Sequence, residues 1–144
     1  MANMNGLKII SALTIHLFLP LAGLLYFLKL KKNMLAENIE NPPTIELFII
    51  FATYGGLLLV SLTSLFWEWS GMASLGTFYL ILGVPILMGL IAFKHRQTKH
   101  NSKYHRLVFK AGIWYYVIAP LTFLLFELLD QLILLLMIIK TGKP

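Results

Sequence analysis

The sequence predicts an all-α integral membrane protein in which four transmembrane helices form one up-down bundle, a single domain over residues 1–144. Three observations lead to this fold class. Hydrophobic residues make up 58% of the chain and charged residues only 12%, a balance far from that of soluble domains. Four apolar runs are each long enough to cross a bilayer, which requires about 20 residues. Six of the twelve basic residues lie in one stretch, residues 94–110, between two of these runs.

The first two spans are expected over residues 9–28 and 44–66. The first apolar run is too long for a cleavable signal peptide, and no small-residue cleavage site follows it, so we expect it to remain as a helix. Asn41, Pro42 and Pro43 precede the second run. Two prolines block extension of a helix backwards and favour a helix start directly after them.

The other two spans are expected over residues 72–93 and 111–139. The last run is longer than a bilayer requires, so we expect this helix to tilt, kink or protrude. The loops of residues 29–43 and 94–110 together hold nine lysines and arginines. The positive-inside rule therefore predicts that both loops are cytoplasmic and both termini outside, in a multi-pass protein of the cell (inner) membrane.

Aromatic residues flank the spans where membrane interfaces are expected. Trp114, Tyr115 and Tyr116 follow the basic stretch, and Trp67 and Trp69 lie in the short connection between the second and third spans. Such residues gather at headgroup level, so we interpret them as an inner and an outer aromatic belt.

Prolines and small residues predict where the helices bend and approach one another. Pro20, Pro85 and Pro120 are expected near the middle of the membrane, where they either bend a packed bundle or open a pocket. Small residues let helix backbones come close, and they serve either packing within the bundle or a dimer face. These small residues are Ala52, Gly55, Gly56, Gly76, Gly83 and Gly89.

Ionisable groups inside the spans are the strongest functional candidates. Helix rise places His16 and Glu127 at similar depth, about 6–10 Å below the outer surface. Tyr116, Glu127 and Gln131 share one face of the last helix with Pro120, and Asp130 lies beside it. Such polar groups face protein or water and not lipid. They either join helices through hydrogen bonds or hold and relay a proton or cation.

The basic stretch predicts contact with anionic lipid headgroups or with an acidic partner. Its cations are Lys94, Arg96, Lys99, Lys103, Arg106 and Lys110. Nucleic acid is not expected as a partner, because these charges flank apolar spans. His95, His100 and His105 recur every five residues, a spacing that turns each by about 140° on a helix, so they share no helical face. Because the chain also has no cysteine, we expect no metal site. Glu46 is expected at the interface, and pairing with Lys31 or Lys32 is an alternative.

The sequence favours a small polytopic membrane protein without catalysis, acting as a subunit or accessory of a membrane complex or as a homo-oligomer. No phosphate loop, dinucleotide fingerprint, metalloprotease motif or nucleophile elbow occurs, and no cofactor is expected. Two alternatives stay open. One is a proton- or cation-conducting or coupled transporter using His16, Glu127 and Asp130. The other is a lipid- or quinone-modifying enzyme with a cavity lined by Tyr116, Glu127 and His16.

Overall fold

A computed structural model describes the backbone of residues 2–64 and 71–141 and, within them, the side chains outside 2–5, 7–8, 12, 63–64, 71–80 and 141. The described residues form four long helices and a short 3-10 turn, with no strand among them. The elements are α1 (Ala2–Ala36), α2 (Thr44–Ser64), α3 (Gly71–Lys94), η1 (Thr98–His100) and α4 (Lys103–Thr141). The expected all-α class is confirmed.

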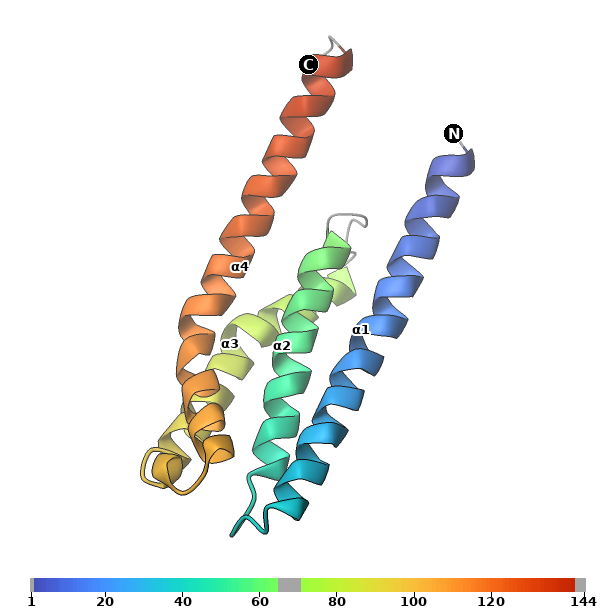
Figure 1. The fold of residues 1–144 in the computed structure, drawn as a ribbon. Coiled ribbons are helices and arrows are strands. Elements are labelled where there is room, and N and C mark those ends of the chain that lie inside the picture. Colours follow the sequence, from blue (N-terminus) through green and yellow to red (C-terminus); the bar gives the residue numbers. More distant parts are fainter. Residues whose placement is uncertain (1, 65–70, 142–144) are drawn as a thin grey trace.

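Successive long helices run in opposite directions (Figure 1). The connections of residues 37–43 and 95–102 therefore lie at one end of the molecule, which we call the closed end. The first turns of α1 and the last turns of α4 lie at the other end, where these two helices extend beyond α2 and stand apart (Figure 1). We call this the open end.

Three helices are long and apolar enough to cross a membrane, consistent with a membrane-embedded protein. These stretches are Ile9–Ala36, Thr44–Leu62 and Lys103–Lys140. The described apolar part of α3 is shorter, Ile81–Lys94, so the span expected over residues 72–93 falls partly on side chains outside the described set.

Both outer helices are longer than the spans expected from hydropathy. α1 continues through Ala36, and α4 begins inside the basic stretch at Lys103 and continues to Thr141. At about 1.5 Å per residue, the 39 residues of α4 extend about 58 Å, roughly twice the hydrocarbon core of a bilayer. At the open end α4 extends beyond α2 (Figure 1).

The chain ends α1 and starts α4 with local hydrogen bonds. Asn38 has a left-handed φ of 47° and donates its backbone N–H to Leu35 O, while Ile39 N–H donates to Met34 O, the pair of bonds of a Schellman helix end. At the start of α4, the Ser102 hydroxyl accepts the backbone N–H of His105 at 3.2 Å, which is an N-cap. Both connections thus turn sharply.

The hydrophobic core occupies the half of the bundle nearest the closed end. Its largest fully buried side chains are Met34, Leu47, Leu57, Met88, Val108 and Tyr115. By contrast, the most apolar stretches of α1 and α4 contain no residue buried within the chain. The helices are therefore held together at the closed end, and much of α1 and α4 presents its apolar surface to the surroundings.

Glycine allows the closest helix contact in this core. A Cβ atom added at Gly112 of α4 would lie 2.9 Å from the backbone oxygen of Met88 and 3.0 Å from the Cβ of Ala92, both on α3. Gly89 similarly lies beneath the Tyr116 hydroxyl, which donates to the backbone oxygen of Pro85. Gly112 was not among the small residues that the sequence pattern singled out.

The glycines of α2 have a different environment. An added Cβ at Gly55 or Gly56 would meet nothing within 4 Å, and the same holds for Gly23 of α1. These three glycines, with Ala52 and Pro20, line an open apolar groove of about 420 Å³ between α1 and α2. Gly55 and Gly56 therefore do not serve close packing within this chain. Gly83 is half-buried, whereas the surroundings of Gly76 lie outside the described side chains.

We expect Gly112→Ala to lower the free energy of unfolding by about 1–3 kcal/mol, because the added methyl group meets α3 backbone that cannot move aside. Gly55→Ala is the matched control, since its methyl group enters open space. Unfolding of both variants in detergent, followed by circular dichroism, measures the difference. Equal stability of the two variants would contradict the close α3–α4 contact.

Candidate functional site

Charged and polar side chains from α2, α3, α4 and the two connections gather at the closed end. We call this set the polar cluster, and it has two parts. One part joins α2 to α3 through Glu46, and the other joins the end of α1 to the start of α4 through Glu37. The sequence placed Glu37 in one loop, Lys94 and Lys103 in another, and Glu46 at the start of the second span; the turns of residues 37–43 and 95–102 bring them together.

Glu46 is the centre of the first part. Its carboxylate accepts a hydrogen bond from the Lys94 ammonium, and it lies 3.4 Å from Nε2 of His95. The Glu46 side chain is only 12% exposed, whereas that of Lys94 is 70% exposed. The alternative partners Lys31 and Lys32 are not the ones Glu46 contacts. The carboxylate is directed instead toward the end of α3.

His95 and His105 are both buried at this end, and their ring centroids lie 5.6 Å apart. Nδ1 of His95 is 3.1 Å from the Thr98 hydroxyl, and Nδ1 of His105 is 2.7 Å from the Ser102 hydroxyl. The five-residue spacing excluded a shared helical face and did not predict this approach of the two rings. That argument assumes one continuous helix, but α3 ends at Lys94 and the chain reverses before α4 begins.

The second part of the cluster centres on Glu37. Its carboxylate accepts hydrogen bonds from the Lys103 ammonium at 2.6 Å and from the Tyr104 hydroxyl at 3.0 Å. The hydrogen bond from Lys103 lowers the pKa of Glu37 below its usual value of 4.5, against the opposing effect of desolvation. Because Tyr104 belongs to the buried core, this contact ties the α1–α2 connection to the first turn of α4.

The polar cluster is suited to holding the helices together. Each carboxylate is engaged by a cation, and each buried imidazole has a hydroxyl group at its Nδ1 atom. Among the described residues no group of three His, Cys, Asp or Glu side chains is arranged to hold a metal ion. The cluster therefore joins the four helices at the closed end.

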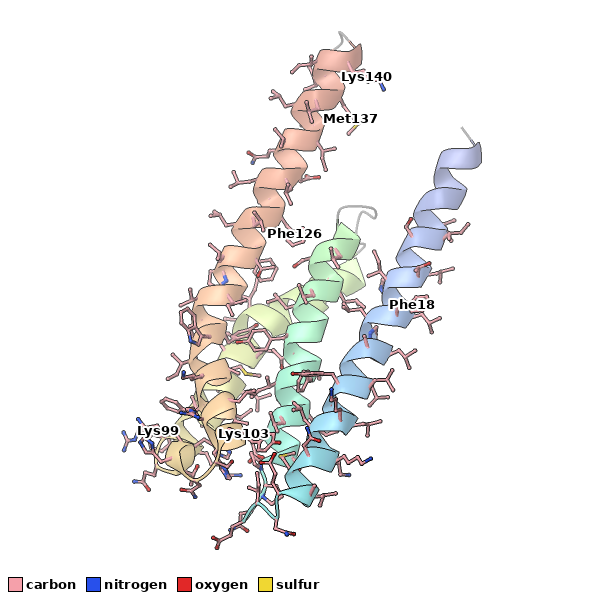
Figure 2. All side chains as sticks on the ribbon, viewed as in Figure 1. Phe18, Lys99, Lys103, Phe126, Met137 and Lys140 are labelled. Carbon is pink, nitrogen blue, oxygen red and sulfur yellow. The ribbon has the colours of Figure 1, made fainter. Side chains whose placement is uncertain are left out.

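The intramembrane candidates of the sequence lie elsewhere. Phe18 and Phe126 stand on opposite sides of α2 in Figure 2. His16 lies two residues from Phe18 on α1, and Glu127 directly follows Phe126 on α4, so each belongs to a different outer helix. A contact between His16 and Glu127 within one chain stays a prediction.

The polar side chains of α4 are exposed on this chain. Glu127 accepts a 3.3 Å hydrogen bond from Gln131 one turn later, and Asp130 is exposed beside them. Tyr116, expected on the same face, donates instead to the backbone oxygen of Pro85 on α3. Tyr116 therefore helps to join α3 to α4 close to a proline of α3.

The structure describes all three prolines and the inner of the two expected aromatic belts. Pro20, Pro85 and Pro120 all lie inside continuous helices. Of the expected inner belt, Trp114 and Tyr116 are exposed. Tyr115 is instead fully buried, because it faces α2 and packs edge-on against Tyr54. The expected outer belt, Trp67 and Trp69, lies outside the described residues.

Comparison with protein-family models, with curated proteins and with solved structures finds no match to this chain. Its function must therefore be inferred from its own residues.

We expect Glu46→Ala to lower the free energy of unfolding by about 1–3 kcal/mol, because it removes the acceptor of the Lys94 hydrogen bond and the carboxylate nearest the buried Nε2 of His95, an atom without a hydrogen bond of its own among the described residues. Lys94→Ala should change it by less than about 1 kcal/mol, since the ammonium is exposed to solvent. Chemical unfolding of both variants in detergent tests this order. Equal losses would show that His95 does not depend on Glu46.

Acid should weaken the Glu37 contact specifically. A carboxylate whose pKa is lowered by folding stabilises the fold above its unfolded-state pKa, and this contribution is lost as the pH falls through the folded-state pKa. We therefore expect Glu37→Gln to lower the Tm relative to the wild type at pH 7, and the gap to close by about pH 3. A gap that is the same at both pH values would contradict the assignment.

Proposed function

We propose that this chain is a non-catalytic, membrane-embedded subunit of a larger helical assembly, and that the open end of α4 binds a transmembrane helix of a neighbouring subunit. In this proposal α3 is the fourth span of the bundle. The neighbour is either a second copy of this chain or a different membrane protein. The proposal rests on the exposed polar side chains of Glu127, Asp130 and Gln131 within an otherwise apolar part of α4.

The relevant part of α4 extends from residue 124 to residue 140. Residues 132–139 are all apolar and all exposed. Within this segment Glu127, Asp130 and Gln131 are exposed as well. A helix of this kind presents both apolar surface and hydrogen-bonding groups that no other part of the described chain covers.

Position along α4 supports a location inside the membrane for these polar groups. Glu127 lies thirteen residues after the exposed Trp114, which corresponds to about 20 Å along the helix. If Trp114 lies at the interface, Glu127 is still within a core about 30 Å thick. A charged side chain near the centre of a helix in lipid costs about 2.5–3.5 kcal/mol, so a polar partner is favoured over lipid.

A second surface of the chain also suits close helix contact. The open groove between α1 and α2 exposes Gly23, Gly55 and Gly56, and small residues are typical of helix–helix interfaces in lipid. This supports an assembly. Tyr116, which was expected to line an enzymatic cavity, donates instead to the backbone oxygen of Pro85 on α3.

Site-specific cross-linking tests the proposal. Because the sequence contains no cysteine, an introduced cysteine is the single thiol that can react. Leu134→Cys lies on the α4 face that carries Glu127 and Gln131, while Leu132→Cys is the control on the opposite face at the same height. Both native side chains are exposed. In native membranes we expect a cross-linked adduct from Leu134→Cys and little from Leu132→Cys.

The size of the adduct distinguishes a second copy from a different subunit. Replacing Glu127 and Gln131 by Leu should weaken the assembly by about three- to thirtyfold for each polar interaction that the substitution removes. A chain that stays monomeric in lipid, with no adduct at either position, would refute the proposed interface.

A further inference from the structure

The lysines and arginines of residues 94–110 divide into two classes. Lys94 and Lys103 are each bound to a carboxylate, that of Glu46 and that of Glu37 respectively. The other four have no carboxylate partner among the described residues. These four are Arg96, Lys99, Arg106 and Lys110.

Aromatic rings accompany two of the four. The guanidinium of Arg96 lies 5.4 Å from the ring centre of Phe93, and the ammonium of Lys99 lies 5.2 Å from that of Phe109. These contacts leave the positive charges uncompensated. Figure 2 shows Lys99 at the closed end, where the connection from α3 to α4 turns.

The other two begin an exposed stripe along α4. Arg106, Lys110, Trp114, Val117 and Leu121 follow one another at three- and four-residue steps, so they share one face of the helix. All five are exposed, and Trp114 is 54% exposed. The buried residues of this part of α4, Tyr104, Val108 and Tyr115, lie on the opposite face.

The order of side-chain types along this stripe favours one class of binding partner. Two cations are followed, about 6 Å further along the helix, by an indole ring and then by aliphatic side chains. An acidic protein surface would match the cations but would not provide acyl chains for the apolar side chains beyond them. A phospholipid with an anionic headgroup offers both, because its charge is joined directly to its acyl chains.

We propose that the stripe of Arg106, Lys110 and Trp114 binds the headgroup of an anionic phospholipid of the surrounding bilayer, with Arg96 and Lys99 adding to the local positive charge. Lys94 and Lys103 are not part of this surface, because Glu46 and Glu37 occupy them. This proposal does not depend on the proposed assembly at the open end.

The test is lipid binding by the full chain in detergent, measured by native mass spectrometry with phosphatidylglycerol and phosphatidylcholine of identical acyl chains. We expect the wild type to bind phosphatidylglycerol more tightly, with a preference that declines as salt is added. In Arg106→Gln/Lys110→Gln this preference should fall by about 25-fold, at about fivefold for each cation near the headgroups.

Two control variants make the result specific. Lys103→Gln/Glu37→Gln also removes two charged side chains but leaves the net charge unchanged, and it should keep the preference within about twofold of the wild type. Lys140→Gln removes one charge at the open end and should have no effect. Circular dichroism confirms that each variant keeps its helices.

Three outcomes would overturn the proposal. The first is that the wild type shows no preference for phosphatidylglycerol, which would leave an acidic protein surface as the better partner. The second is that Arg106→Gln/Lys110→Gln retains the preference. The third is that Lys140→Gln reduces the preference by the same fivefold or so that is expected for each cation of the stripe, which would show that only the net charge matters.

Discussion

Close contact between the backbones of α3 and α4 at Gly112 is the constraint on which the packed half of this bundle depends. Lipid is as apolar as the side chains, so membrane helices are joined mainly by close packing and by hydrogen bonds. With α4 this near α3, Tyr116 reaches the backbone oxygen of Pro85 on one side. On another side, Tyr54 of α2 donates to the backbone oxygen of Ala111 at 2.6 Å. Three helices thus meet around a single residue without a side chain.

The closed and open ends satisfy their polar groups differently. At the closed end the carboxylates of Glu37 and Glu46 are bound within the chain, and this leaves the remaining cations available to the exterior. At the open end Glu127 has Gln131 of its own helix as a partner, and Asp130 is exposed. The two proposed contacts therefore have a common origin. Each uses polar groups for which the described residues provide no opposite charge and no neighbouring helix.

Hydropathy and helix-breaking residues were sufficient to predict the helices, because these features act within a few residues. Pro42 and Pro43 predicted the start of α2, and the length of the last apolar run predicted that α4 is longer than a single span requires. Contacts between helices were not predictable in the same way. Periodicity gives the direction of a side chain around its own helix but not the identity of the helix opposite. For this reason the sequence missed Gly112, the contact of Glu46 with Lys94, the burial of Tyr115, and the approach of His95 to His105. Arguments from periodicity assume a single helix axis. This assumption fails where the chain turns between two helices, as it does at η1.

The two tightly turned connections have a consequence for how the protein reaches this structure. α1 packs mainly on α2, and α3 mainly on α4, so most contacts join neighbours in the chain. Each pair is a helical hairpin closed by a short loop, and short loops lose little entropy on closure. Contacts that are local in sequence form quickly. The first hairpin can therefore assemble in the bilayer while the second is still being synthesised. The later docking of the second hairpin on α2, through Tyr54, Tyr115 and the contact of Glu46 with Lys94, joins the two halves into one molecule.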